Sequence, residues 1–179
     1  MADSRVYRVL IVDDEEMMRK LMGTFLSRLG HLCATAIDGV EALDKMKGSK
    51  IDAVVTDIKM PKMDGNALTS EISKQYPGLP VMVMTGFTEE SSAITAISAG
   101  AREFIQKPFS FDEFAIRLHK MIRDSEILRR TEGKENSEKE IHDLMNELET
   151  TIKKGPGNSA IELSLGTSTQ SSHSSSAMG

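Results

Sequence analysis

The sequence predicts an α/β domain built on a parallel β-sheet, followed by a separate helix and a polar tail. Short apolar runs alternate five times with helical patterns, and this alternation is typical of parallel strands joined by crossover helices. Three of the runs are nearly continuous and valine-rich, as expected for strands buried on both faces. The five expected strands are Val6–Val12, Leu32–Ile37, Ala53–Thr56, Val81–Met84 and Glu103–Ile105.

The segments between these runs carry apolar residues at three- and four-residue spacing, which predicts helices. The fifth helix is the best marked, because Ser110 can cap its first turn and Glu113 can reach back to complete a capping box. This helix should end near Arg130. Its apolar stripe consists of Phe111, Phe114, Leu118, Met121 and Ile122.

The composition changes after the fifth helix. Residues 131–136 are polar and include Gly133, which predicts a hinge or a frayed helix end. Ser137 and Glu140 form a second capping-box pattern, so a new helix is expected to run from about Ser137 to about Lys153. Its stripe consists of Ile141, Leu144, Met145, Leu148 and Ile152. The expected organisation is therefore a domain at 5–130, a hinge and amphipathic helix at 131–154, and a disordered Ser/Gly-rich tail at 155–179.

Composition and charge exclude several classes of protein. No apolar run approaches the roughly 18 residues that a membrane span needs, and the polar N-terminus lacks the apolar core of a secretory signal. The single cysteine, Cys33, cannot form an intramolecular disulfide, so a cytoplasmic location is expected. A net charge of −5 over 179 residues gives no electrostatic footprint for nucleic acid.

Polar residues follow four of the expected strands at their carboxyl ends. These residues are Asp13 and Asp14, then Asp57, then Thr85, then Lys107. In an open α/β sheet the carboxyl ends of the strands form the edge where ligands bind. We therefore expect these side chains to meet at one site.

Three carboxylates at one point repel each other unless a cation lies among them. Oxygen ligands favour a hard ion, so Mg²⁺ is the expected cofactor. A lysine and a hydroxyl beside a carboxylate and a metal ion are the groups that a phosphoryl-transfer site uses.

Each of these residues also has an ordinary structural interpretation. Asp13 and Asp14 could cap a helix, Asp57 could belong to a turn, and Lys107 could be a surface lysine. Four independent placements at one sheet edge favour the functional interpretation. By contrast, His31, His119, His142 and His173 are scattered without metal-ligand spacing, and Cys33 is expected to pack in the interior.

The motifs together resemble the receiver domain of two-component response regulators over about residues 7–123. The matching segments are Leu10–Glu15, Asp57–Pro61, Asp64–Gly65, Met84–Gly86, Ala99–Ala101 and Lys107–Phe109. The resemblance implies a flavodoxin-like, doubly wound sheet of five parallel strands in the order 2-1-3-4-5. It also implies a cis bond between Lys107 and Pro108.

The resemblance also assigns roles to individual residues. Asp57 would be the phosphorylated nucleophile, and Lys107 would pair with the phosphoryl oxygens. Magnesium would be held by Asp14, Asp57 and the carbonyl of Lys59, with Asp13 acting through a water molecule. Thr85 and Phe104 would form the switch pair. Lys59 and Phe87 flank the path of the hydrolytic water and offer no group to orient it, which predicts a long-lived acyl phosphate.

The function implied is a phosphorylation-dependent signalling switch rather than an enzyme acting on other molecules. The donor would be a sensor histidine kinase or a phosphotransfer protein, and the output would be a protein target or a homodimer. A phosphate-independent interaction module and the receiver part of a larger transcriptional regulator remain alternatives. Direct nucleic-acid binding is not expected, because residues 132–154 contain seven acidic residues against four lysines.

Overall fold

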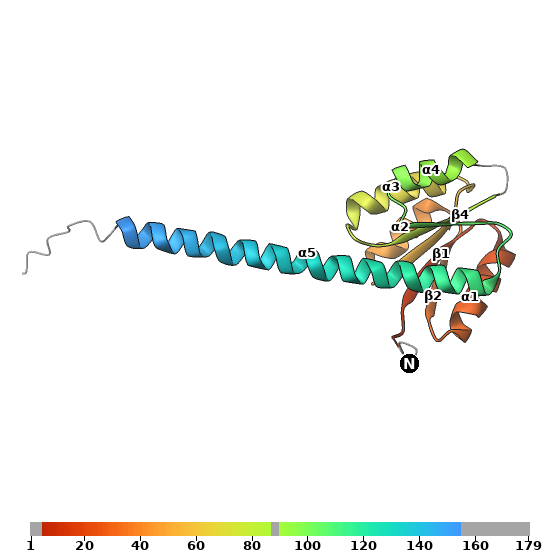
Figure 1. The fold of residues 1–179 in the computed structure, drawn as a ribbon. Coiled ribbons are helices and arrows are strands. Elements are labelled where there is room, and N and C mark those ends of the chain that lie inside the picture. The colour runs from red at the N-terminus through yellow and green to blue at the C-terminus, as the bar shows by residue number, and fades with distance from the viewer. Residues whose placement is uncertain (1–4, 87–89, 155–179) are drawn as a thin grey trace, which may run out of the picture. The chain divides into compact units, whose positions relative to one another are not determined.

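The structure is a computed structural model that describes residues 5–86 and 90–154. Five parallel strands form one sheet in the order β2-β1-β3-β4-β5 (Figure 1). This confirms the predicted flavodoxin-like topology. The strands are β1 (Arg8–Val12), β2 (Leu32–Ala36), β3 (Ala53–Asp57), β4 (Val81–Thr85) and β5 (Glu103–Gln106). The last three each extend one residue beyond the prediction, so Asp57 and Thr85 are themselves the final residues of strands.

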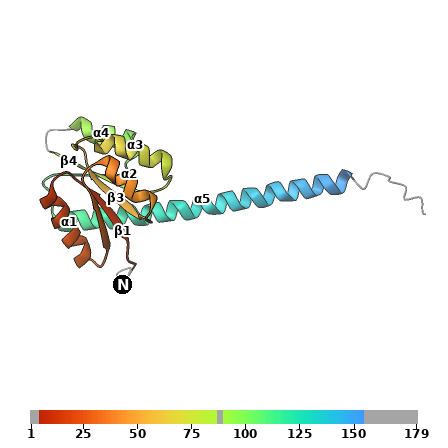
Figure 2. The same ribbon diagram turned by 180° about the vertical axis from the view of Figure 1, so that it is seen from behind.

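Helices cover both faces of the sheet, as Figures 1 and 2 show. They are α1 (Glu16–Arg28), α2 (Gly39–Lys47), α3 (Gly65–Gln75), α4 (Glu90–Ser98) and α5 (Phe111–Lys154). One core lies between the sheet and helices α1 and α5, where Met22, Leu26, Phe114 and Leu118 are fully buried. The other core lies under α2, α3 and α4 and is built from residues such as Leu68 and Ile72.

The start of α5 confirms half of the predicted capping box. The hydroxyl oxygen of Ser110 accepts a hydrogen bond from the backbone N–H of Glu113 at 3.1 Å. The carboxylate of Glu113 does not reach back, because it pairs with Arg117 one turn further along at 2.9 Å. The cap therefore rests on the serine alone.

The structure has helix through residues 131–136, where the sequence predicted a hinge or frayed end. Likewise, Ser137 lies inside α5 and does not begin a new helix. A single glycine costs a helix only about 1 kcal/mol relative to alanine, and the surrounding Lys, Glu and Arg residues are good helix formers. Gly133 therefore interrupts the helix too weakly to end it.

The chain nevertheless divides into two compact units between Glu135 and Asn136, inside the segment where the hinge was expected. The predicted tail at 155–179 lies outside the described residues. Within the part of the chain that the structure describes, no helix is long and apolar enough to cross a membrane.

Candidate functional site

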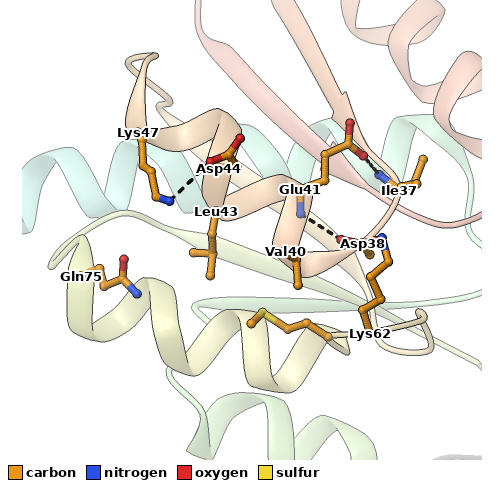
Figure 3. A pocket seen from close by; sticks show the side chains of 10 residues that line it. Ile37, Asp38, Val40, Glu41, Leu43, Asp44, Lys47, Lys62 and Gln75 are labelled. Atoms are coloured by element: carbon orange, nitrogen blue, oxygen red, sulfur yellow. Dashed lines mark hydrogen bonds and ion pairs between the residues drawn. The ribbon is translucent and has the colours of Figure 1, made fainter.

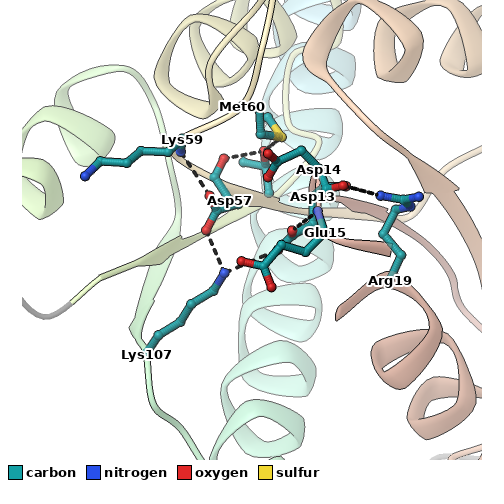
Figure 4. A network of polar contacts seen from close by, with 9 residues as sticks. Asp13, Asp14, Glu15, Arg19, Asp57, Lys59, Met60 and Lys107 are labelled. Atoms are coloured by element: carbon teal, nitrogen blue, oxygen red, sulfur yellow. Dashed lines mark hydrogen bonds and ion pairs between the residues drawn. The ribbon is translucent and has the colours of Figure 1, made fainter. Parts of the chain in front are cut away.

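Asp57 lies at the carboxyl edge of the sheet with both oxygens of its carboxylate engaged (Figure 4). Its Oδ1 accepts a hydrogen bond from Lys107 Nζ at 2.8 Å. Its Oδ2 accepts one from the backbone N–H of Lys59 at 3.0 Å. The side chain is only 16% exposed, so it is held in place yet still open on one side. This is the arrangement expected of a nucleophile that must be reached from solvent.

Lys107 reaches this carboxylate from the loop that follows β5. Its backbone N–H donates to the carbonyl oxygen of Thr85 at 2.7 Å, which fixes the loop beside the end of β4. The Lys107–Pro108 bond is cis, as expected. Nζ also lies 3.3 Å from Asp13 Oδ2. Burial disfavours the ammonium ion, but the hydrogen bond and charge of Asp57, with those of Asp13, outweigh it and raise the pKa of Lys107. The lysine is therefore a fixed positive charge.

Asp13 and Asp14 are adjacent in sequence but lie in different environments. Asp13 is 1% exposed, and its Oδ1 accepts a hydrogen bond from the backbone N–H of Glu15 at 2.9 Å. Burial raises the pKa of the Asp13 carboxyl against the lowering effects of the Glu15 N–H and of Lys107. Asp14 is exposed. Asp13 is thus an inner carboxylate paired with Lys107, and Asp14 is an outer carboxylate that faces solvent.

A cavity of about 340 Å³ opens over Asp57. Besides Asp14, Asp57 and Lys59, it is lined by Glu15, Ile58, Met84, Gly86 and Lys107. Among the described residues no group of three or more His, Cys, Asp or Glu side chains is arranged to hold a metal ion. This finding does not conflict with Mg²⁺, because that ion keeps several waters and is usually held by one or two carboxylates. Asp14, Asp57 and a backbone carbonyl fit that pattern.

Two structural contributors to the site were missed by sequence reasoning. The guanidinium of Arg19 donates to the carbonyl oxygens of Asp13 at 2.8 Å and Asp14 at 2.9 Å, fixing the loop that carries both carboxylates (Figure 4). Gly65 lies so close to β3 that a Cβ atom would stand 2.1 Å from the Asp57 carbonyl oxygen. An arginine in a first helical turn has no distinctive pattern, and the Asp64–Gly65 motif contributes to the family resemblance without indicating the close approach of Gly65 to Asp57.

The predicted switch residues lie on neighbouring strands. Val83 pairs in register with Phe104, and Thr85 pairs with Gln106. Because side chains alternate along a strand, Thr85 and Phe104 share the sheet face on which Val83 packs against α3 and α4. Thr85 is buried and Phe104 is half-buried.

Of the two residues expected to control phosphate lifetime, only Lys59 lies among the described residues. The Lys59 side chain is exposed and extends away from the Asp57 carboxylate in Figure 4, although its backbone N–H binds that carboxylate. Phe87 lies outside the described residues. The predicted role of Lys59 as a cation lying across the phosphoryl group therefore requires its side chain to turn toward Asp57.

Cys33, His31 and His119 do not line the cavity over Asp57. Cys33 is half-buried, and burial raises the pKa of its thiol to about 11, in keeping with a packing role. Two of the four histidines, expected to be scattered, lie side by side. His31 Nε2 and His119 Nε2 lie 2.7 Å apart, because β2 begins beside α5.

Comparison with known families decides the classification of this site. The family model described as response regulator receiver domain matches residues 9–119, which include the acidic pair, Asp57, Thr85 and Lys107. The chain belongs to the response regulator receiver domain family. Receiver domains are signalling proteins of two-component systems, interact with histidine kinases and generally bind Mg²⁺.

The receiver domain is similar to curated regulators from several organisms. It is 39% identical over 116 residues to a probable transcriptional regulator, ycf27, of Guillardia theta, covering 65% of this chain and 45% of that one. It is 35% identical over 133 residues to the alkaline phosphatase synthesis transcriptional regulatory protein PhoP of Bacillus subtilis, covering 74% and 55%. The chain thus spans about half the length of the curated relatives it matches.

Solved structures show the same fold. A response regulator receiver domain protein from Clostridium thermocellum superposes with a TM-score of 0.65 at 30% identity, covering 69% of this chain and 99% of that one. NtrX from Brucella abortus superposes with a TM-score of 0.67 at 32% identity, covering 84% and 35%.

Proposed function

We propose that this receiver domain is a phosphorylation-dependent switch in which Asp57 accepts a phosphoryl group from a phosphohistidine of a sensor kinase or phosphotransfer protein. One observation carries the proposal. The Asp57 carboxylate is held at the mouth of a cavity by Lys107 Nζ and by the Lys59 N–H, with Asp14 on the same cavity wall. A nucleophile, a fixed cation and a second carboxylate converge there.

In the proposed transfer, a carboxylate oxygen of Asp57 attacks the phosphorus atom and the phosphorus–nitrogen bond of the donor breaks. The electron pair of that bond leaves with the imidazole, and Asp57 becomes an acyl phosphate. Lys107 pairs with the negative charge of the Asp57 carboxylate before transfer. After transfer its Nζ can pair with the negatively charged phosphoryl oxygens instead. The chain thereby catalyses only its own modification.

The groups proposed to hold magnesium are Asp14, Asp57 and the carbonyl of Lys59, with Asp13 acting through water. When bound, the ion supplies positive charge that stabilises the phosphoryl oxygens during transfer. Asp13 cannot replace Asp14, because its oxygens are committed to the Glu15 N–H and to Lys107. This difference between the two carboxylates supports Asp14 as the direct ligand and Asp13 as the ligand that acts through water.

The proposed response to phosphorylation uses the sheet face shared by Thr85 and Phe104. The Thr85 hydroxyl would move to the new phosphoryl oxygens, and the Phe104 ring would repack in the space that it leaves. Phenylalanine has no hydroxyl, so ring packing alone would report the switch. The output would be a protein target or a homodimer. The expectation that this chain does not bind nucleic acid directly stays a prediction, since curated relatives are named transcriptional regulators.

Intact-mass analysis after incubation with acetyl phosphate and Mg²⁺ tests the proposal. The wild type should gain one phosphoryl group, and Asp57→Asn should gain none. Asp64→Asn is the matched control, because Asp64 lies in the loop that follows Asp57 and caps α3 by accepting the Ala67 N–H at 2.7 Å. Asparagine preserves that cap. Equal uptake by wild type and Asp57→Asn would refute Asp57 as the acceptor.

We further propose that Lys59 and Phe87 make the acyl phosphate long-lived, because neither offers a carboxylate or amide to orient water. The proposal for Phe87 rests on its sequence position two residues after Thr85. Phosphate loss should be followed in purified phosphorylated protein and in a Lys59→Asn, Phe87→Glu double variant. Faster loss is expected from the variant. Equal rates would show that these residues do not set the lifetime.

A further inference from the structure

The loop between β3 and α3, residues 58–64, is fixed at two places. Its neck closes where the Gly65 N–H donates to the Ile58 carbonyl oxygen at 2.9 Å, directly after Asp57. Its tip, Lys62 and Met63, lies against the start of α2. Lys59, whose N–H binds the Asp57 carboxylate, lies between the neck and the tip.

The tip is held by an ion pair with a buried carboxylate (Figure 3). Lys62 Nζ lies 2.9 Å from Asp38 Oδ2, and the Asp38 side chain has no solvent exposure. A buried carboxylate is costly without a partner. The ion pair with Lys62 lowers the pKa of Asp38, aided by the Glu41 N–H, which favours the charged carboxylate beside the lysine.

The backbone of the tip is also fitted closely to α2. Lys62 has a φ of +62°, in the left-handed region that a non-glycine residue adopts at a cost. The Gly39 N–H donates to the Met63 carbonyl oxygen at 3.3 Å. A Cβ on Gly39 would stand 2.6 Å from Met63 Cγ, so glycine lets the Met63 side chain lie against the helix.

Capping of α2 does not account for these contacts. The cap uses the other oxygen of Asp38, Oδ1, which accepts the Glu41 N–H at 2.9 Å. Oδ2 is therefore available for the loop. Pro61 lies between Met60 and Lys62 and has a fixed φ. Few backbone torsions can therefore absorb a movement of the tip, so a displacement of the tip also moves Lys59.

We propose that Asp38 and Lys62 are positioning residues for the phosphoacceptor site. By fixing the loop tip on α2, the pair holds the Lys59 N–H on Asp57 and sets the direction of the Lys59 carbonyl. The consequence for magnesium and phosphoryl transfer rests on the proposed function, whereas the positioning of Lys59 does not. The cavity of about 580 Å³ between α2 and α3, which Asp38 and Lys62 line, is the space into which a released tip could move.

Two substitutions remove the ion pair without removing the N-cap of α2 and without adding backbone strain at residue 62. Asp38→Asn removes the charge and keeps an N-cap residue, and Lys62→Asn removes the cation with a residue that tolerates positive φ. Lys62→Arg should preserve the pair. Ala42→Gly is the control for stability, because Ala42 is buried on α2 and glycine weakens the helix without touching the loop.

Amide hydrogen exchange resolved by NMR should show faster exchange of the Gly39 and Lys59 N–H groups in both Asn variants, but not in Lys62→Arg or Ala42→Gly. Calorimetric titration with Mg²⁺ should show affinity weakened about tenfold, as for other losses of support around a metal site. Unchanged Lys59 exchange in Lys62→Asn would overturn the inference, even if Gly39 exchanged faster. If the wild type bound no Mg²⁺, the proposed function would fail, and Lys59 exchange would still decide the positioning role.

Discussion

Helix α5 carries two apolar stripes with the same helical period and opposite surroundings. In the first unit Phe114 and Leu118 are fully buried, and Met121 and Ile122 are at most 4% exposed. In the second unit the corresponding residues are 58–61% exposed, namely Ile141, Leu144, Met145 and Leu148. A helical period predicts a helix in both places, but it does not say what covers the helix.

The difference lies in what each stripe has to pack against. The first stripe lies over the sheet beside α1, where the Phe25 and Phe111 rings stack with centroids 4.6 Å apart. The second has no sheet beneath it within the described residues of its own unit. An isolated helix of this length is marginal in water, so its apolar side chains call for a partner.

Matched leucine substitutions give the largest expected effect. Leu118→Ala should lower the free energy of unfolding by about 2–5 kcal/mol, since it removes a buried side chain and leaves a cavity. Leu144→Ala should change it by no more than about 0.5 kcal/mol in the monomer. Urea denaturation of both variants measures the contrast. Similar losses in the two variants would mean that the second stripe is buried in solution as well.

Hydrogen exchange of residues 138–152 tests whether the second stripe finds a partner. We expect exchange to slow at least about tenfold, equivalent to ~1.4 kcal/mol, at high protein concentration or after phosphorylation of Asp57. Leu144→Ser, which keeps the helix but weakens the stripe, should remove the protection. Uniformly fast exchange at every concentration and in both phosphorylation states would exclude docking by this protein alone.

The sequence predicted the first unit better than the second for a physical reason. Asp57 and Thr85 end apolar strands and Lys107 follows one, and a parallel sheet brings strand ends to one edge whatever the details of packing. The contacts that align the site are different. The contacts of Arg19 and of the Lys62–Asp38 pair depend on how far a long side chain extends and, for Lys62, on a positive φ. No periodicity in the sequence encodes either feature.

The helix continues through the segment predicted as a hinge or frayed end, and the reason is energetic. Gly133 and its polar neighbours match the pattern of a helix break, but the free energy they cost is small beside the hydrogen bonds of a continuing helix. Conversely, Ser137 and Glu140 match a capping box only in composition. A capping residue has a role only where the helix begins.

Gly133→Ala tests whether the helix continues through this segment. Because Gly133 is helical and does not have a positive φ, alanine should stabilise the helix locally by up to about 1 kcal/mol. Slower amide exchange across residues 131–137 measures the gain, with Ala115→Gly in the first unit as the reverse control. If alanine instead speeds exchange there, the segment is a hinge, as the sequence predicts.

The smallest expected effect is a change in the pH dependence of stability, and it uses the histidines of the two units. In the first unit, His31 is buried against Tyr7 and His119. Burial lowers the pKa of His31, and the charge of His119 lowers it further. An unfolded histidine has a pKa of about 6.5, so below that pH the unfolded chain takes up a proton that folded His31 resists. The free energy of unfolding should therefore fall as the pH drops through about 6.5 toward the lowered pKa of the folded state.

Urea denaturation between about pH 8 and about pH 5 should show a shallower fall in His31→Gln than in the wild type. His142→Gln, at an exposed position in the second unit, is the matched control. If His31→Gln keeps the wild-type slope, the pair is a packing contact without a role in proton linkage.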